Sequence, residues 1–262
     1  MLGAQIISDV NTYKPIIDKS KCINCGACVR NCWRGIYAKT EEGIQVDQGR
    51  LKSCIGCMEC FKLCPTGALS IIEEVYMERP SEIHDFYTLC EVRQSCRDYL
   101  DKPVSREQLV QLAEVVRLAP TIRNAQQYKM IIIDDYALRK TFADKVICYE
   151  NATANSFAKI DLPYFVLFVR EKIKEGAINT AKDGFEINYD MGCLGSYFTL
   201  AATEMGLSTC IIGRFDNEAA EKMFHIEKGG AAFVVAVGYA RSNTIRKKYR
   251  KEFKDVISFN KY

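Results

Sequence analysis

Two cysteine-rich stretches decide the fold of the N-terminal part of the chain: residues 22–32 read CINCGACVRNC, and residues 54–65 read CIGCMECFKLCP. Each stretch has the spacing C-x2-C-x2-C-x3-C. Three thiolates at this spacing wrap one cube of iron and sulfide, and the fourth thiolate of each run binds the other cluster. The spacing therefore predicts two [4Fe-4S] clusters, one held by Cys22, Cys25, Cys28 and Cys64, the other by Cys54, Cys57, Cys60 and Cys32.

The alternative for these cysteines is a pair of structural zinc sites, because zinc is often held by four thiolates. Zinc sites usually pair two C-x2-C arms and have no use for a third and fourth cysteine in both runs. The stretch resembles bacterial two-cluster ferredoxins, which favours iron–sulfur clusters. One departure is Trp33, which follows the first run where Pro65 follows the second. It bears on the packing around one cluster and removes no ligand.

Charge and hydropathy exclude several classes of protein. The chain of 262 residues carries a formal net charge of +3, which gives no electrostatic footprint for a nucleic acid. Its longest apolar runs, 164–169 and 231–239, have the length of strands and are far short of a membrane span. The N-terminal sequence lacks a basic start followed by an apolar core, so we expect no signal peptide. We therefore expect neither a nucleic-acid partner nor a membrane.

The remaining cysteines and the histidines do not form a further site. Eight of the thirteen cysteines are assigned to clusters. The other five are scattered without a pairing pattern: Cys90, Cys96, Cys148, Cys193 and Cys210. Free thiols and iron–sulfur ligands both indicate a reducing compartment, so we expect a cytoplasmic protein. The two histidines, His84 and His225, are too isolated for a metal site.

The chain divides into two predicted domains, residues 1–80 and residues 81–262. The first has little hydrophobic core, so the clusters are expected to hold it together, and a linker is predicted at 78–81. Its short strands are expected at residues 16–17, 44–47 and 69–72. The second domain has ordinary helix and strand periodicity and is expected to be α+β.

The second domain carries clear signals for the ends of its helices. Ser105 and Gln108 are typical of a capping box, and the helix that they open is expected to end before Pro120. A long helix at 184–205, apolar on most sides and closed by Gly206, is expected to be buried centrally or in a dimer interface. Another helix is predicted at 138–147, and strands at 130–133, 163–169, 208–212 and 231–237. The tail from residue 241 is expected to pack elsewhere, for example on a partner subunit.

A short basic segment, residues 93–97, reads RQSCR. In an extended segment, Arg93, Ser95 and Arg97 point to one face. Two guanidinium groups beside a hydroxyl can bind a phosphate monoester, because arginine donates pairs of hydrogen bonds to its oxygens. On its own, such a pentapeptide is more often a solvated basic surface.

Further motifs follow this segment in a fixed order. They read APTIRNAQQY at 119–128, LAATEMGLST at 200–209, IIGRFD at 211–216, VGY at 237–239 and KYR at 248–250. Together with RQSCR they resemble the nitroreductase family of flavin enzymes, over roughly residues 88–256. The chain departs from the family pattern at Gln127 and Tyr128, where Pro-Trp is usual, and at Thr121 and Ile122, where a serine pair is common.

The nitroreductase resemblance implies FMN held between the two subunits of a homodimer. The residues that it places at the phosphate and ribityl chain are Arg93, Ser95, Arg97, Lys248 and Arg250. Thr121, Ile122 and Asn124 would approach the flavin from the turn, and Gly213 or Arg214 would offer a backbone N–H to its N5 or O4. Taken singly, Lys248 and Arg250 are equally compatible with a solvated tail. The sequence assigns no catalytic residue.

Together, these features predict an α+β chain in which a ferredoxin-like domain precedes a nitroreductase-like, FMN-dependent domain. It would be an oxidoreductase that passes electrons between two [4Fe-4S] clusters and FMN to reduce a small organic acceptor: a nitroaromatic, a quinone or an activated double bond. The chain has no G-x-G-x-x-G dinucleotide motif, and NAD(P)H or an external ferredoxin or flavodoxin is the candidate donor. Two alternatives stay open. One is NAD(P)H- or flavin-driven reduction of an external carrier through the clusters, and the other is a non-enzymatic electron carrier or redox sensor.

Overall fold

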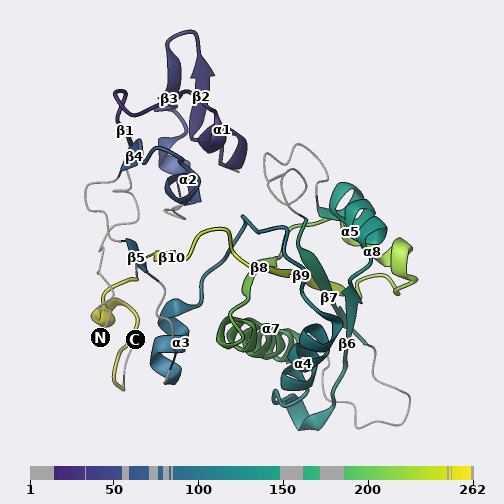
Figure 1. The fold of residues 1–262 in the computed structure, drawn as a ribbon. Helices are drawn as coiled ribbons and strands as arrows, with labels where there is room; N and C mark the ends of the chain where they lie inside the picture. The colour runs from purple at the N-terminus through teal and green to yellow at the C-terminus, as the bar shows by residue number, and fades with distance from the viewer. Residues whose placement is uncertain are drawn as a thin grey trace. The chain divides into compact units, whose positions relative to one another are not determined.

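The computed structural model describes residues 15–32, 34–54, 59–70, 76–78, 83, 85–147, 162–171, 186–246, 248 and 250–260. The chain forms two units (Figure 1). The first combines residues 1–82 with residues 242–262, and the second is residues 83–241. The chain first passes from one unit to the other between residues 82 and 83, and the predicted boundary is at residue 80. The tail, which we expected in the second domain, groups with the first unit.

The first unit is built from short elements around a small core. They are β1 (Ile16–Ile17), α1 (Ala27–Asn31), β2 (Tyr37–Thr40), β3 (Gly43–Val46), the 3-10 turn η2 (Leu51–Ser53), α2 (Glu59–Lys62) and β4 (Leu69–Ser70). β1 pairs antiparallel with β4, and β2 pairs antiparallel with β3. The predicted strands at 16–17 and 44–47 correspond to β1 and β3. The strand predicted at 69–72 begins with β4, and its last two residues lie outside the described part.

The returning tail adds a strand to the first unit. β5 (Tyr76–Glu78) pairs antiparallel with β10 (Thr244–Arg246), in which Ile245 is 2% exposed. The tail that we expected to pack elsewhere therefore packs on its own chain through β10, before the 3-10 turn η5 (Phe253–Asp255). Glu78, the first residue of the predicted linker, belongs to β5, and residues 79–81 lie outside the described part.

A four-stranded antiparallel sheet forms the centre of the second unit. In spatial order its strands are β6 (Tyr128–Ile133), β7 (Tyr164–Arg170), β9 (Ala231–Gly238) and β8 (Ser208–Ile212). Each strand pairs antiparallel with its neighbour. All four predicted strands are present, and β8 has the predicted ends. β8 lies at one edge of the sheet and β6 at the other.

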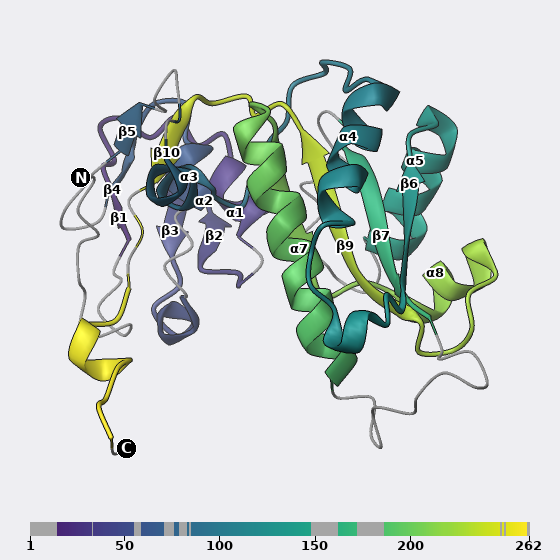
Figure 2. The same cartoon turned by 90° about the horizontal axis from the view of Figure 1, so that it is seen from below.

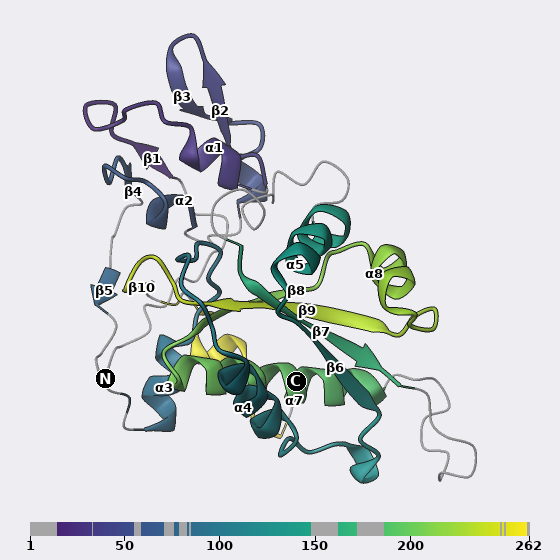
Figure 3. The same cartoon turned by 45° about the vertical axis from the view of Figure 1, so that its right-hand side comes forward.

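Helices cover both faces of this sheet, because its strands are apolar on both sides. On one face lie α5 (Tyr136–Phe142), the π-helical turn η4 (Ala143–Ile147) and α8 (Asn217–Phe224), and on the other α4 (Arg106–Val116) and α7 (Glu186–Glu204). Along β7, Phe165 and Leu167 pack in the first cluster, whereas Val166 and Phe168 pack in the second. Figure 3 shows the sheet between the two groups of helices, and Figure 2 views it from the α7 side.

Capping motifs fix the ends of two helices, as the sequence predicts. The Ser105 hydroxyl accepts a hydrogen bond from the Gln108 N–H at 3.2 Å, and the Gln108 side-chain carbonyl accepts one from the Ser105 N–H at 3.1 Å. At the end of α7, Gly206 has a φ of 76°, and the Leu207 N–H donates to the Ala202 carbonyl at 2.8 Å. This Schellman geometry favours glycine, because a Cβ is strained at the left-handed position.

The long helix α7 is buried on one face and exposed on the other. Leu194, Phe198 and Ala202 are at most 1% exposed and pack against the sheet and α4. On the opposite side, Tyr189 is 59% exposed and Tyr197 is 38% exposed. The prediction of a long helix from 184 to 205 is confirmed over the residues described, which begin at 186.

Two helices and one turn of the second unit were not predicted: α3 (Phe86–Val92), α8 and the 3-10 turn η3 (Ile122–Asn124). Both helices begin at an aspartate cap. The Asp85 carboxylate accepts from the Thr88 N–H, and the Asp216 carboxylate accepts from the Ala219 N–H, each at 2.9 Å. An aspartate ahead of helix-forming residues is a usable start signal, but seven- and eight-residue helices show little periodicity.

Candidate functional site

Most of the predicted cluster ligands pack around the core of the first unit. Cys28 belongs to this core, and five more pack against it: Cys22, Cys32, Cys54, Cys60 and Cys64. Cys25 is exposed, and Cys57 lies outside the described residues. Six of the eight predicted ligands therefore share one small core.

The four cysteines assigned to the first cluster line one cavity: Cys22, Cys25, Cys28 and Cys64. Their neighbours there are mostly apolar and include Ile44 and Leu69. Among the described residues, no three His, Cys, Asp or Glu side chains are grouped so as to hold a single metal ion. Four thiols that line an apolar cavity are the ligand type of an iron–sulfur cluster, so the chemistry of this donor set fits such a cluster.

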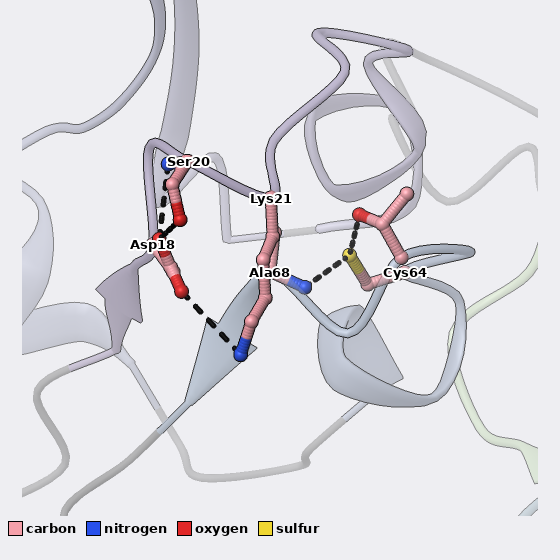
Figure 4. A network of polar contacts seen from close by, with 6 residues as sticks. Asp18, Ser20, Lys21, Cys64 and Ala68 are labelled. Atoms are coloured by element: carbon pink, nitrogen blue, oxygen red, sulfur yellow. Dashed lines mark hydrogen bonds and ion pairs between the residues drawn. The ribbon is translucent and has the colours of Figure 1, made fainter.

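Hydrogen bonds favour the ionised form of Cys64 (Figure 4). The Ala68 N–H donates to Cys64 Sγ at 3.2 Å, and the Thr66 hydroxyl lies 3.8 Å from the same sulfur. Burial opposes ionisation of this thiol, but the hydrogen bonds from Thr66 and the following backbone outweigh it and lower the pKa of Cys64. The loop is anchored by the Asp18 N–H, which donates to the Ala68 carbonyl at 2.7 Å. The thiolate, which these hydrogen bonds favour, is the form of cysteine that binds metal.

The ligands assigned to the second cluster have donors of their own. The Ile36 N–H lies 3.4 Å from Cys32 Sγ, and the Tyr37 hydroxyl donates to Cys60 Sγ at 3.1 Å. Tyr37 is 4% exposed. Burial, together with the neighbouring Cys60, raises the pKa of Tyr37 above its usual range, so its hydroxyl stays protonated. Burial also raises the pKa of Cys28 to about 11.

The RQSCR segment lies along the outer side of β8. Ser95 forms a parallel bridge with Thr209 of β8, and the Cys96 N–H donates to the Thr209 carbonyl at 2.8 Å. Arg93, Ser95 and Arg97 are half-buried, whereas Cys96 between them is buried. The segment is extended at this bridge, and alternate residues of an extended segment, here Arg93, Ser95 and Arg97, are expected to point to the same side.

Several contacts hold this segment on the sheet. The Tyr99 hydroxyl donates to the Cys96 carbonyl at 2.7 Å and to a carbonyl of β9 at 3.3 Å. Arg241 forms an ion pair with Asp98 at 3.1 Å and donates to the Tyr99 carbonyl at 2.8 Å. Gly238 makes room for this packing, because a Cβ there would lie 2.9 Å from the Tyr99 ring. A candidate binding segment is thus held by a rigid scaffold.

The turn after α4 contains three non-glycine residues with left-handed backbone, φ 49–55°: Arg123, Asn124 and Gln126. Such conformations cost energy and concentrate at ligand sites. The turn is anchored on α7, because the Ile122 N–H donates to the Asp190 carboxylate at 3.0 Å. The side chains of Thr121 and Ile122 are half-exposed.

The remaining candidate FMN ligands lie in two other places. Gly213 and Arg214 are exposed and follow β8 directly. A Cβ added at Gly213 would meet no heavy atom within 4 Å. Lys248 and Arg250 belong to the first unit. The structure thus groups Arg93, Ser95 and Arg97 along β8 and places the 213–214 pair beyond its end.

Two residues of these sites were missed in the sequence. Tyr37 reaches a predicted cluster ligand that is 23 residues away, and Asp190 holds the turn from 68 residues away. No local pattern marks either residue, because each meets its partner only through the packing of separate elements.

Comparison with known families assigns both parts of the chain. The nitroreductase family model matches residues 91–239, which is more than half of the 262-residue chain. This chain belongs to the nitroreductase family. Residues 21–68 of this chain also match the model of a 4Fe-4S dicluster domain. The predicted pairing of a ferredoxin-type domain with a nitroreductase domain is confirmed.

Solved structures confirm the fold of the second unit. A nitroreductase-family protein from Clostridium difficile is 21% identical, with a TM-score of 0.55, and the match covers 68% of this chain and 100% of that one. A protein from Exiguobacterium sibiricum described as a nitroreductase, and solved in complex with FMN, is 18% identical with a TM-score of 0.57. That match covers 69% of this chain and 99% of the other. The α+β fold expected for the nitroreductase domain is therefore present.

Curated relatives match the cysteine-rich part of this chain. The PorD component of pyruvate synthase from Methanocaldococcus jannaschii is 33% identical over 64 residues, which are 24% of this chain and 71% of that protein. A component of the NADH-quinone oxidoreductase of Rhizobium meliloti is 32% identical over 83 residues, which are 29% of this chain. The chain spans only 10% of that protein's length. None of the helices in the described part is long and apolar enough to span a membrane.

Proposed function

We propose that this chain uses two [4Fe-4S] clusters and FMN together to reduce a small organic acceptor: a nitroaromatic, a quinone or an activated double bond. The observation that carries the proposal is a set of thiols around their own cavity in the same chain as a nitroreductase fold. The clusters, when bound, supply one-electron transfer, and FMN, when bound, supplies two-electron chemistry at the acceptor. NAD(P)H or an external ferredoxin or flavodoxin is the donor.

The cluster ligands in this proposal follow the cysteine spacing. One set is Cys22, Cys25, Cys28 and Cys64, which line a common cavity. The other set is Cys54, Cys57, Cys60 and Cys32, of which the described members pack against the same core. We assign the clusters to residues 1–80 and the flavin to residues 81–262; of the latter, residues 242–262, which include β10, group with the first unit.

The protein's part at the flavin is to bind it and to orient it. Arg93 and Arg97 bind the phosphate through their guanidinium groups, and the Ser95 hydroxyl adds a hydrogen bond between them. The extended pairing of Ser95 with β8 supports this role, because alternate residues of an extended segment point to the same side. The family resemblance also assigns Lys248 and Arg250 to the phosphate, and both residues belong to the first unit.

Two backbone segments would bind the ring system of the flavin. Ile122 contributes its side chain, because its N–H is already bonded to Asp190. Thr121 and Asn124 flank it in the left-handed turn. Gly213 or Arg214 donates a backbone N–H to the ring, which can come close because no side chain stands at Gly213.

We also place the protein as a cytoplasmic homodimer. The exposed face of α7, with Tyr189 and Tyr197, supports the dimer, because large apolar rings on one helix face are typical of an interface. The thiols support a reducing compartment, since none of the described cysteines outside the cluster sets forms a disulfide. These are Cys90, Cys96, Cys193 and Cys210; Cys148 lies outside the described residues.

The proposal is tested by the anaerobic absorption spectrum of the purified protein, with iron, acid-labile sulfide and flavin measured. We expect about eight iron ions, about eight sulfides and one FMN per chain. Stopped-flow mixing with NADH, NADPH or reduced ferredoxin then identifies the donor. Turnover with a nitroaromatic or a quinone identifies the acceptor.

Other outcomes would contradict parts of the proposal. A purified protein that contains iron but no flavin, and whose composition and activity do not change in Arg93→Ala, would indicate an electron carrier or redox sensor. Rapid reduction of the protein by NAD(P)H, followed by electron transfer only to an external carrier, would indicate that electrons flow from the flavin outward through the clusters. Zinc in place of iron would overturn the electron-transfer role altogether.

A further inference from the structure

The two cluster-binding halves of the first unit repeat each other around their last cysteines. Cys32 is followed four residues later by Ile36, whose N–H lies 3.4 Å from the Cys32 sulfur. Cys64 is followed at the same distance in sequence by Ala68, whose N–H lies 3.2 Å from the Cys64 sulfur. One backbone N–H donor is therefore equivalent in the two halves; Cys64 receives further backbone hydrogen bonds from Thr66 and Leu69.

The next position breaks this symmetry. Five residues after Cys32 stands Tyr37, and five residues after Cys64 stands Leu69. Both side chains are buried in the same core, at 4% and 4% exposed. Tyr37 donates its hydroxyl to Cys60 Sγ at 3.1 Å, whereas a leucine side chain has no donor. An O–H donor is thus added to a ligand of the second cluster at a position where the other half has none.

The other half has one hydroxyl of its own near a ligand, but in a different setting. Thr66 Oγ1 lies 3.8 Å from Cys64 Sγ, and Thr66 is exposed. Water competes for an exposed hydroxyl, so its net contribution is small. The Tyr37 hydroxyl is buried and lies closer to its sulfur, so its bond is made in a medium of low dielectric constant, where it is stronger.

We propose that Tyr37 sets the two clusters to different reduction potentials, by holding the cluster of Cys54, Cys57, Cys60 and Cys32 at a higher potential than that cluster would otherwise have. One electron enters a cluster on reduction and increases the negative charge on its sulfur ligands. A hydrogen bond to such a ligand therefore stabilises the reduced form more than the oxidised form. No proton is transferred, because the tyrosine O–H bond stays intact. Tyr37 acts through Cys60 and is a positioning residue.

The inference rests on the cluster assignment of the proposed function and goes beyond it. Its test is a redox titration of the full chain with both clusters assembled, followed by electron paramagnetic resonance, in which both potentials are read in one sample. Tyr37→Phe keeps the ring and removes only the hydroxyl. We expect the equilibrium constant for one-electron reduction of one cluster to fall about tenfold, which lowers its reduction potential by about 59 mV. The other potential should stay in place and serves as the internal control.

A matched variant removes the other hydroxyl. Thr66→Val takes away the exposed group near Cys64, and we expect a much smaller shift, confined to the other potential. Unchanged potentials in Tyr37→Phe, or equal shifts of both, would overturn the inference. Failure to find iron in the unsubstituted protein would instead overturn the proposed function.

A second variant, expected to shift the same potential in the opposite direction, tests the inference if Tyr37→Phe does not assemble its clusters. A fluorinated tyrosine placed at position 37 keeps the shape of the side chain and makes its hydroxyl a stronger donor. We expect the same potential to rise in this protein. A fall, or no change with the clusters intact, would contradict the proposed hydrogen bond.

Discussion

Gly213 carries no side chain at the point where β8 ends, and the space that a Cβ would occupy there is open. The proposed function places the flavin ring in this space. A side chain added at position 213 should therefore affect FMN binding and leave folding unaffected. Gly213→Val should leave the unfolding temperature unchanged and weaken FMN binding by roughly tenfold or more, because overpacking costs about 1–3 kcal/mol. FMN retention on gel filtration and titration of the apoprotein measure this effect.

The control for that substitution is Lys129→Val, which places an exposed valine on β6, at the opposite edge of the sheet. We expect FMN binding to be unchanged in this variant. Equal FMN affinity in both variants would contradict the placement of the flavin beyond the end of β8. A large loss of stability in Gly213→Val would show that the space is needed by the fold.

Residues of the cluster site differ in how far the sequence reveals them. The eight cysteines are marked by their spacing alone, because three ligands of one cluster come from a single loop. Tyr37 is not marked, because its hydroxyl meets Cys60 only when β2 packs beside α2. The sequence reveals the candidate phosphate ligands only in part: Arg93, Ser95 and Arg97. Their spacing at every second position is visible in the sequence, but the position of the segment on the sheet depends on Asp98, Tyr99 and their distant partners.

At the scale of single elements, the capping box of α4 offers a test of local stability. Ser105 and Gln108 exchange two hydrogen bonds at the start of a helix that buries Leu109, Leu112 and Val116. Ser105→Ala removes the hydroxyl that accepts from the Gln108 N–H and leaves this N–H without its acceptor, so we expect a loss of about 1 kcal/mol in the free energy of unfolding. Urea denaturation followed by circular dichroism measures this loss.

Thr141→Ala is the matched control for the loss of a hydroxyl. The Thr141 hydroxyl donates only to the Ala137 carbonyl within α5, and this carbonyl already belongs to the helix. We expect a change within about 0.5 kcal/mol. A comparable loss in both variants would mean that the hydroxyl of Ser105 does not act as a cap.

The elements predicted best are those whose ends are fixed by local chemistry. The capping box opens α4, the Schellman motif closes α7, and the apolar run of β8 lies between Gly206 and Gly213. The sequence does not reveal β5 and β10, because each has three residues and their pairing joins distant parts of the chain. The helix predicted at 138–147 is present as α5 followed by the π-helical turn η4, a change of winding that hydrophobic periodicity does not show.

For the whole molecule, the homodimer is the prediction with the clearest readout. Tyr197 is 38% exposed on the outer face of α7. Tyr197→Glu places a charge in the proposed interface, where its desolvation is unfavourable, so we expect a monomeric mass by light scattering and loss of FMN. Tyr136→Glu on α5, where the tyrosine is 65% exposed on the other side of the sheet, should remain dimeric.

The outcome for the unsubstituted protein matters as much. A monomeric mass with FMN bound would contradict the dimer and would place all flavin contacts within one chain. A dimer that persists in Tyr197→Glu would move the interface away from this part of α7.

The return of the chain to its first unit through β10 has a consequence for how the two halves can be separated. The second unit is topologically an insertion between residues 82 and 242, so a gene truncated after residue 80 encodes a cluster unit without one of its strands. A small ferredoxin that keeps the β5–β10 strand pair would instead be made by excising residues 83–241 and joining the cut ends with a short linker. By the same reasoning, the second unit, residues 83–241, can be produced as one continuous segment without circular permutation, but this segment lacks Lys248 and Arg250, which the proposed function assigns to the phosphate.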